Sequence, residues 1–384
     1  MGGASLRKRQ RMSPERTEAM ETFLRSAGWG DASLSPLPGD ASTRRYIRLD
    51  QGGKTAMLMD QPQSAEAPQC PPGASPDQRR ALGYNAIARL AGADCGRFVA
   101  AADFLRERGL SAPVIYAADV KHGFVLIEDL GDDLYANVLS NGHAADEPEL
   151  YGAAIDALAI LHRNRAPAGL GNGKPLYAYD ETALLAETSL LTEWFIPLAL
   201  GRPAGHDECQ EHQALWRSAL RSVLASPAVF VHRDYHAQNL FWLPQREGAA
   251  RVGLIDFQDA VAGPASYDMI SLLEDARRDV SPALARAMTH RYIDAMRRAD
   301  GTFDDEEYRA QSAVMAAQRN AKITGIFARL YRRDRKPRYL SYLPRVWGYL
   351  ENDLTHRALA DFKRWYDRKV PAEARHQIII GEAA

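Results

Sequence analysis

The chain has 384 residues, of which 46% are hydrophobic and 25% charged, a balance that is typical of a globular protein with ample material for a core. Its formal net charge of −1 excludes the positive field by which proteins coat nucleic acid or an anionic membrane. The three cysteines are widely spaced and form no C-x-x-C pair, and no apolar run approaches the ~20 residues of a membrane span. We therefore expect a cytoplasmic protein of two domains or lobes.

Residues 13–130 are predicted to form an N-terminal lobe with a mixed sheet of five strands. Residues 1–12 carry four basic side chains without a following apolar segment, which predicts a disordered tail rather than a secretory signal. Five prolines between residues 61 and 76 exclude regular structure there and indicate an insertion. The elements expected in this lobe are a helix at 13–28, a hairpin at 34–50 with its connection at 39–43, a strand at 56–60, helices at 77–91 and 97–109, and strands at 114–118 and 124–127.

Residues 131–384 are predicted to form a mostly helical C-terminal lobe, joined to the first by a hinge at Glu128–Gly131. Apolar positions recur at helical spacing, and no sequence repeat with a longer period is found. One apolar stripe ends at His162, which we interpret as a hydrogen-bonded core residue. The helical patterns begin at residue 148 and recur at 180–200, 206–225, 264–300 and 304–333, with another after Pro344.

Two apolar strands within residues 229–257 are each followed by a carboxylate, Asp234 and Asp256, and Asn239 stands five positions after the first. Phosphoryl transfer needs a carboxylate that orients the acceptor hydroxyl and takes its proton, and hard oxygen ligands that hold Mg²⁺ against a triphosphate. Asp234 is suited to the first role, and Asn239 and Asp256 to the second. A buried polar cluster or a strand-end cap would explain any one of these residues alone, but the ordered set favours catalysis.

The spacing of His232-Arg233-Asp234 to Asn239 is similar to the H-R-D-x-x-x-x-N catalytic loop of kinases, and Asp256-Phe257-Gln258 stands where they have D-F-G. Together with Gly263–Asp268, these segments resemble the aminoglycoside phosphotransferase family. The resemblance implies an α+β protein-kinase-like fold of two lobes, with ATP and Mg²⁺ as cofactors. It also implies that Asp234 is the catalytic base, that Asn239 and Asp256 are metal ligands, and that Asp268 braces the catalytic loop.

Further segments resemble one branch of that family, the bacterial kinases that phosphorylate the anomeric hydroxyl of N-acetylmuramate and N-acetylglucosamine in peptidoglycan recycling. These segments are 39–42, 44–46, 58–60, 255–260 and 318–330. The resemblance implies a monomeric kinase that acts on a small-molecule sugar and binds neither nucleic acid nor membrane. Two alternatives are a kinase of the same fold for an aminoglycoside, choline or homoserine, and a catalytically silent nucleotide-binding module.

The resemblance implies nucleotide contacts from the first hairpin and from the hinge. Ser42 and Thr43 lie in the hairpin connection, where backbone N–H groups can cover phosphates, although a plain surface turn is the alternative. Backbone groups around Glu128 and Leu130 in the hinge can hydrogen-bond an adenine edge without demanding particular side chains.

One position departs from the kinase pattern. Where protein kinases have a lysine on the third strand, this chain reads Met57–Asp60. We expect Arg44 or Arg45 to supply the missing positive charge, because an arginine fork suits phosphate oxygens. Ordinary salt bridging on the strand surface is the alternative for both arginines.

Four residues are candidates for binding the acceptor sugar. His236 and Asp259 lie close in sequence to the two carboxylates of the site, and either could contact sugar hydroxyls. Arg319 and Lys322 are three residues apart and share one face of a predicted helix, where a cation could meet the lactyl carboxylate of N-acetylmuramate. The alternative is that these two are solvated charges on an amphipathic helix.

Overall fold

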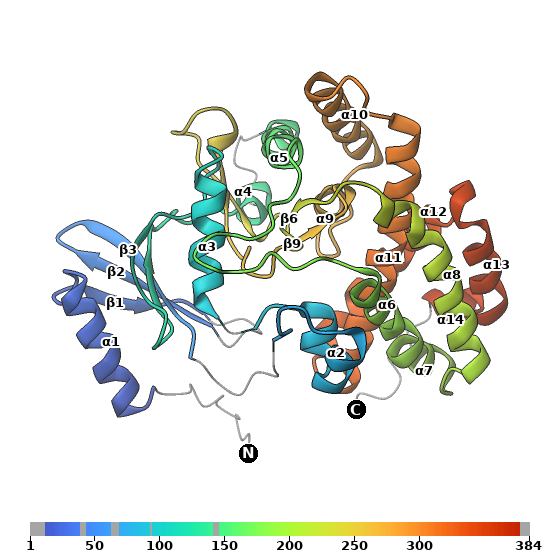
Figure 1. Ribbon diagram of the computed structural model, residues 1–384, viewed down its shortest axis with the longest axis horizontal. Coiled ribbons are helices and arrows are strands. Elements are labelled where there is room, and N and C mark those ends of the chain that lie inside the picture. The colour runs from blue at the N-terminus through green and yellow to red at the C-terminus, as the bar shows by residue number, and fades with distance from the viewer. Residues whose placement is uncertain (1–11, 39–43, 63–68, 93, 141–145, 377–384) are drawn as a thin grey trace, which may run out of the picture. The chain divides into compact units, whose positions relative to one another are not determined.

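The computed structural model describes residues 12–38, 44–62, 69–92, 94–140 and 146–376. The expected N-terminal tail lies almost entirely outside them. Tertiary contacts divide the chain into two compact units (Figure 1). Unit 1 is drawn from residues 1–66, 93–99 and 113–129, and unit 2 from residues 67–92, 100–112 and 130–384. Residues 67–92 and 100–112 thus pack with the helical unit, although a single boundary at residue 130 would place them in the N-terminal lobe.

Unit 1 is built on a five-stranded sheet with the order β1-β2-β3-β5-β4. The strands are β1 Ser33–Pro36, β2 Arg45–Gln51, β3 Lys54–Asp60, β4 Ile115–Asp119 and β5 Phe124–Ile127. All four neighbouring pairs are antiparallel, so the expected mixed character of the sheet is wrong. Three of these pairs are hairpins, β2 and β3 being joined by only Gly52 and Gly53, and short connections can join only antiparallel neighbours.

Helix α1, Pro14–Ser26, provides the core of unit 1 together with the sheet. The Ser13 side chain accepts a hydrogen bond from the Arg16 backbone N–H and thereby caps the start of the helix. The buried apolar residues of the helix and of the sheet that pack together are Met20, Phe23, Leu24, Ile47, Leu49, Ala56, Leu58, Phe124 and Leu126.

Unit 2 is mostly helical, as expected. Its α-helices, with α3 beginning in unit 1, are α2 Pro76–Leu82, α3 Cys95–Arg106, α4 Tyr135–Ser140, α5 Glu147–His162, α6 Glu181–Leu190, α7 Ile196–Leu200, α8 His206–Ala225, α9 Ser266–Leu273, α10 Pro282–Ala299, α11 Asp305–Arg332, α12 Leu343–Asp353, α13 Ala360–Lys369 and α14 Ala372–His376. The π-helical turns η1 Asn85–Arg89 and η2 Leu191–Phe195 and the 3₁₀ turns η3 Gly248–Arg251, η4 Pro337–Tyr342 and η5 Arg357–Leu359 complete the set.

Two of the predicted helices are interrupted in the structure. The pattern at 77–91 divides into α2 and η1 because Gly83 has a φ of 96°, a backbone conformation that ends an α-helix. The pattern at 264–300 divides into α9 and α10, and the Ser281 side chain caps the second helix by accepting from the Leu284 N–H.

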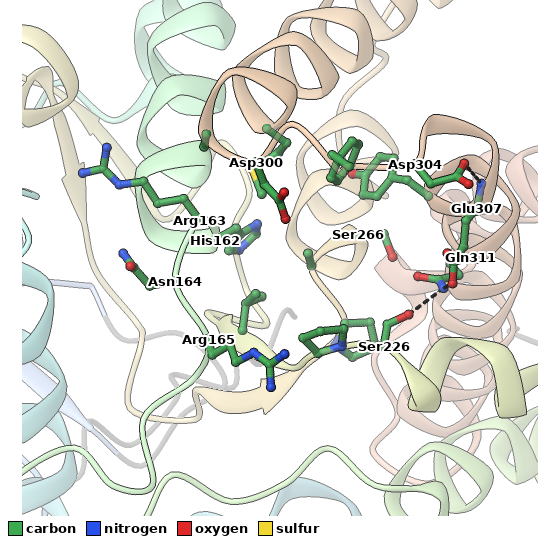
Figure 2. A pocket seen from close by; sticks show the side chains of 18 residues that line it. His162, Arg163, Asn164, Arg165, Ser226, Ser266, Asp300, Asp304, Glu307 and Gln311 are labelled. Atoms are coloured by element: carbon green, nitrogen blue, oxygen red, sulfur yellow. Dashed lines mark hydrogen bonds between the residues drawn. The ribbon is translucent and has the colours of Figure 1, made fainter.

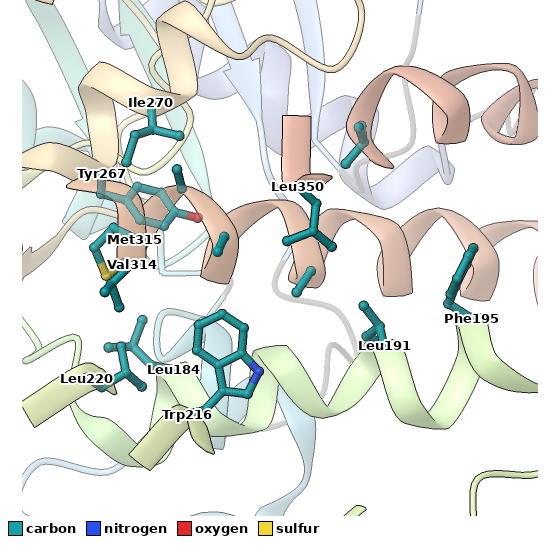
Figure 3. Close-up of a cluster of buried hydrophobic side chains, with 14 of the residues drawn as sticks. Leu184, Leu191, Phe195, Trp216, Leu220, Tyr267, Ile270, Val314, Met315 and Leu350 are labelled. Atoms are coloured by element: carbon teal, nitrogen blue, oxygen red, sulfur yellow. The ribbon is translucent and has the colours of Figure 1, made fainter. Parts of the chain in front are cut away.

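Helix α11 lies at the centre of unit 2, packed against α6, η2, α9 and α12. Figure 3 shows Leu184, Leu191 and Phe195 of the α6–η2 stretch on the side that faces Val314 and Met315 of α11. By length and composition alone, the helical stretch Glu181–Leu200 could cross a membrane. Half of its apolar window is buried in this core, so here it serves as a core helix.

Gly325 allows α11 to approach the end of α6 closely. A Cβ atom at Gly325 would overlap the backbone carbonyl of Leu190, which cannot move aside as a flexible side chain can. We expect Gly325→Ala to lower the free energy of unfolding by about 3 kcal/mol, measured by chemical denaturation. Gly348→Ala is the matched control, because nothing lies within 4 Å of its added Cβ in α12; there, alanine should stabilise by up to ~1 kcal/mol. Equal effects of the two substitutions would contradict this packing.

His212 makes the stability of unit 2 sensitive to acid. The side chain is fully buried, its Nε2 accepts from Trp216 Nε1 at 3.0 Å, and burial lowers its pKa to about 3. A histidine in the unfolded chain has a pKa near ~6.5. Between this value and the lower pKa of the folded chain, the unfolded chain binds a proton at His212 and the folded chain does not. Stability is therefore lost with falling pH across this window.

We expect His212→Gln, which retains an acceptor for Trp216, to flatten the dependence of unfolding free energy on pH. Between roughly pH 4 and 6, the slope of the unfolding free energy against pH should be smaller in the variant by about 1.4 kcal/mol per pH unit, the amount linked to one proton. Denaturation curves at several pH values test this, and parallel curves for variant and wild type would refute it.

Candidate active site

Two short antiparallel ribbons position the catalytic stretch in unit 2. Strand β6, Val229–Val231, pairs with β9, Val261–Gly263, and strand β7, Leu240–Trp242, pairs with β8, Val252–Leu254. The loop that carries Asp234 and Asn239 runs from β6 to β7, and Asp256 follows β8. The predicted placement of polar residues after apolar strands is therefore confirmed.

The start of this loop is held by the buried carboxylate of Asp268. Asp268 Oδ2 accepts from the His232 N–H at 2.7 Å, and its Oδ1 accepts from the Arg233 N–H at 2.9 Å. Arg233 has a φ of 76°, a strained conformation for an arginine, and these two bonds help to fix it. His162 Nδ1 hydrogen-bonds Tyr292 Oη at 3.0 Å in the same region, as expected of a core histidine.

The loop brings the three predicted catalytic residues together. Asn239 Nδ2 donates to the backbone carbonyl of Asp234 at 2.9 Å. The Asn239 carbonyl accepts from the Ile255 N–H at 3.2 Å, which places Asp256 beside Asn239 at one end of the β7–β8 ribbon. All three side chains are half-buried, and Asp256 Oδ1 accepts from Gln258 Nε2 at 2.9 Å. Two carboxylates and one amide are thus carried by segments that hydrogen-bond one another at this end of the ribbon.

A buried ion network, which the sequence analysis did not predict, anchors the loop from below. Arg233 Nη2 lies 2.7 Å from Glu187 Oε1, and Lys322 Nζ lies 2.8 Å from the same oxygen. Burial raises the pKa of Glu187, but Lys322 and Arg233 outweigh burial and lower it below its usual value. The carboxylate therefore stays charged. The signal in the sequence was Glu187, which stands between the apolar residues Leu184 and Leu190 in a predicted helix, since a buried charge needs a partner.

Arg233 also connects the loop to η1. Its Nη1 donates to the backbone carbonyl of Arg89 at 2.9 Å, and its Nη2 donates to that of Ala88 at 3.2 Å. Arg89 Nε in turn lies 2.9 Å from Asp259 Oδ2. The turn η1 is therefore bonded both to the loop between β6 and β7, through Arg233, and to the segment after β8, through Asp259.

The structure gives Arg319 and Lys322 partners in the core. Arg319 Nη2 donates to Ser271 Oγ at 3.0 Å, and Lys322 Nζ donates to Tyr267 Oη at 3.0 Å as well as pairing with Glu187. Neither side chain is a solvated surface charge, so that alternative for the two is wrong. The reason is that α11 is packed by other helices on several sides rather than lying on a surface.

His236 and Asp259 lie on the two segments of the site. His236 is buried, and burial lowers its pKa to about 4, so the imidazole is neutral near pH 7. Within the described part of the chain its Nδ1 has no hydrogen-bond partner. Asp259 is held by Arg89, as described above. Contact of either residue with a substrate stays a prediction.

The predicted nucleotide-binding residues are spread over both units. Ser42 and Thr43 lie outside the described residues. Arg44 is buried immediately before β2. Arg45 Nη2 lies 2.9 Å from Asp60 Oδ2, which is the salt bridge considered as the alternative for Arg45. In the hinge, the Glu128 N–H donates to the Val114 carbonyl at 2.8 Å, and both Glu128 and Leu130 are half-buried.

A cavity of about 340 Å³ lies elsewhere in unit 2, where the end of α5 and the start of α9 meet α10 and α11. Figure 2 shows His162, Arg165, Ser226 and Ser266 among the residues around it. Its lining does not include Asp234, Asn239 or Asp256, so it is separate from the catalytic residues.

The chain is similar to known phosphotransferases and kinases over most of its length. Residues 33–302 match the phosphotransferase enzyme family (APH). The chain is 45% identical to the N-acetylmuramate/N-acetylglucosamine kinase of Caulobacter vibrioides, over 95% of this chain and 99% of that protein.

Solved structures share the fold at much lower identity. A putative aminoglycoside phosphotransferase from Ralstonia eutropha matches with a TM-score of 0.58 and 15% identity, over 91% of this chain and 98% of that one. The streptomycin–ATP complex of APH(2'')-IIa matches with a TM-score of 0.51 and 15% identity, over 91% and 98%. These likenesses confirm the α+β protein-kinase-like fold of two lobes. The chain belongs to the phosphotransferase enzyme family.

Proposed function

We propose that this phosphotransferase transfers the γ-phosphate of ATP to the anomeric hydroxyl of N-acetylmuramate and of N-acetylglucosamine, forming the sugar 1-phosphates. The observation that carries the chemistry is the joining of Asp234, Asn239 and Asp256 at one end of the β7–β8 ribbon. The choice of sugars is supported by the 45% identity, over nearly the whole chain, to a kinase named for both.

Asp234 is the base in this proposal. Its carboxylate orients the anomeric hydroxyl and takes its proton as the oxygen attacks the γ-phosphorus. The side chain is half-buried, so a substrate can reach it, while the loop beneath it is fixed by Asp268 and Arg233. This rigidity matters because phosphoryl transfer is catalysed largely by positioning.

Asn239 and Asp256 fit the requirements of a magnesium ion that arrives with a nucleotide. Among the described residues there is no cluster of three or more His, Cys, Asp or Glu that could hold a metal. Mg²⁺ is commonly bound by one or two protein ligands together with phosphate oxygens and water, so one amide oxygen and one carboxylate suffice. The Asn239 amide donates through its nitrogen, which leaves the oxygen as its ligating atom. When bound, the ion would neutralise charge on the phosphates.

For the nucleotide, we infer backbone contacts from Ser42 and Thr43 to the phosphates and from the hinge at Glu128 and Leu130 to adenine. Arg44 or Arg45 would supply the phosphate-binding cation, and Arg45 also pairs with Asp60. For the acceptor, we retain the four residues proposed from the sequence. His236 and Asp259 would act at the catalytic segments, whereas Arg319 and Lys322 would have to act from their places in the core.

We further infer that the enzyme acts as a monomer in the cytoplasm, where its three free cysteines would stay reduced.

A substrate panel tests the proposed reaction. ADP release is measured with N-acetylmuramate, N-acetylglucosamine, an aminoglycoside, choline and homoserine. We expect turnover with the two amino sugars and none above background with the other three. Turnover with one of those three alone, or ADP release with no acceptor, would overturn the proposal.

A further inference from the structure

The cavity at the end of α5 is lined by opposite charges from different elements. Arg163 and Arg165 come from the segment that follows α5, whereas Asp300, Asp304 and Glu307 come from the end of α10 and the start of α11. We propose that this cavity binds a zwitterion of the amino acid class, with the ligand carboxylate at Arg165 and the ligand ammonium group at Asp300. The proposed phosphoryl transfer makes no use of this site.

The charges around the cavity are available to a ligand. Among the residues that the structure describes, none of these five side chains forms an ion pair. Other arginines of unit 2 are paired, as Arg291 is with Asp156 at 2.6 Å. Asp300 Oδ1 accepts from the Thr302 N–H at 2.9 Å, which orients the carboxylate and leaves Oδ2 for an ammonium group. A ligand with both charges would therefore displace water and no protein partner.

A buried hydroxyl supplies a further donor for the carboxylate. Ser266 is only 3% exposed and lines the cavity (Figure 2), and within the described part of the chain its Oγ has no hydrogen-bond partner. Such a group needs a water molecule or a ligand to satisfy it. Ser266 also begins α9, whose N-cap residue Ala265 has no side chain that could accept from the first turn. A carboxylate bound here would accept from Ser266 and face the positive end of the helix.

The rest of the lining indicates what kind of body joins the two charged groups. Apolar residues fill much of it, among them Val229, Pro264, Met296 and Phe303. The volume of about 340 Å³ falls within the range of small-molecule sites. A phosphate or a dicarboxylate would meet the acidic residues, and a diamine would meet the arginines. An amino acid with an apolar side chain, such as leucine, matches both charges and the apolar wall.

The cavity borders the residues that support the catalytic loop. His162 Nε2 lies 3.7 Å from Asp268 Oδ2, and Ser266 precedes Asp268 by two residues. Asp268 in turn accepts from the backbone N–H groups of His232 and Arg233. A bound amino acid would therefore lie behind the loop, away from the residues that carry out the transfer.

The test is calorimetric titration of the full-length enzyme with three compounds of one carbon skeleton. L-Leucine carries both charges, 4-methylpentanoate lacks the ammonium group, and 3-methylbutylamine lacks the carboxylate. We expect L-leucine to bind about 10- to 100-fold more tightly than either analogue, the range for hydrogen bonds to charged groups. No measurable binding of L-leucine, or equal binding of all three compounds, would overturn the proposal.

Variants assign each charge to its residue. Arg165→Gln should remove the advantage of L-leucine over 3-methylbutylamine, and Asp300→Asn should remove its advantage over 4-methylpentanoate. Asparagine keeps an acceptor for Thr302, so the local backbone is preserved. Arg221→Gln is the control, because Arg221 is an exposed arginine of α8 that does not line the cavity. Both advantages should persist in that variant.

The pattern of these affinities separates recognition from a structural role. If Arg165 and Asp300 only shape the cavity, then each variant weakens all three compounds equally and the proposal is overturned. Thermal melts show that each variant is folded. Titration in the presence of saturating N-acetylglucosamine locates the site. Unchanged binding of L-leucine supports a separate cavity, and displacement by the sugar would place the amino acid at the acceptor site and refute the inference.

Discussion

Replacing Asp234 with Asn is expected to lower kcat by about 10²–10⁴-fold, the usual contribution of a positioned base. Asparagine has nearly the same shape and can still hydrogen-bond the acceptor hydroxyl, but it cannot take the proton. The loop around it is fixed by backbone bonds to Asp268 and by the Arg233 side chain, none of which involves the Asp234 carboxylate. The KM for ATP should therefore change little. Steady-state rates of ADP release measure both quantities.

Asp361→Asn provides a control for the same chemical change away from the site. Asp361 lies in α13, where its exposed carboxylate pairs with exposed Arg364 across one helical turn. Such surface pairs contribute little, so this variant should retain wild-type turnover. An Asp234→Asn enzyme within a few-fold of wild type would remove Asp234 from the role of base.

Replacing Glu187 with Gln is expected to lower the free energy of unfolding by about 3–5 kcal/mol, the cost of breaking a buried ion pair by removing one partner. An amide has almost the same volume but cannot neutralise Arg233 and Lys322, which both lie at one carboxylate oxygen. Two buried cations would then face each other without a counter-charge. Urea denaturation followed by circular dichroism measures the loss.

Glu181→Gln is the matched control in the same helix. Glu181 pairs with Arg217 at 3.2 Å, and both side chains are about half exposed. Removing this surface pair should change stability by less than about 1 kcal/mol. If the two Glu→Gln variants lose similar stability, then the network under the catalytic loop is not the anchor that its geometry indicates.

The catalytic loop was predictable from the sequence because the positions of its residues depend on neighbouring residues in the chain. Asp234, Asn239 and Asp256 owe their positions to short strands and to fixed spacings along the chain, which any reader of the sequence can measure. Asp268 was foreseen through the family resemblance, and the structure shows the two backbone N–H groups that it accepts from. Such features can be recognised without knowledge of the tertiary structure.

The supporting contacts were not predictable because they join distant parts of the chain. Glu187 and Arg233 are 46 residues apart, and Arg89 and Asp259 are 170 apart. No spacing or periodicity encodes such a pairing. The alternative that Arg319 and Lys322 are solvated charges failed for a related reason: helical periodicity identifies a shared face, but it does not tell whether other helices cover that face.

Phosphorus NMR of the product formed from ATP and N-acetylmuramate tests the central claim most directly, because it reports both whether transfer occurs and which hydroxyl receives the phosphoryl group. We expect one new phosphomonoester signal, coupled to the anomeric proton of the sugar, that is absent with Asp234→Asn over the same time. A signal from phosphate on another hydroxyl, or only free phosphate and ADP, would contradict the claim.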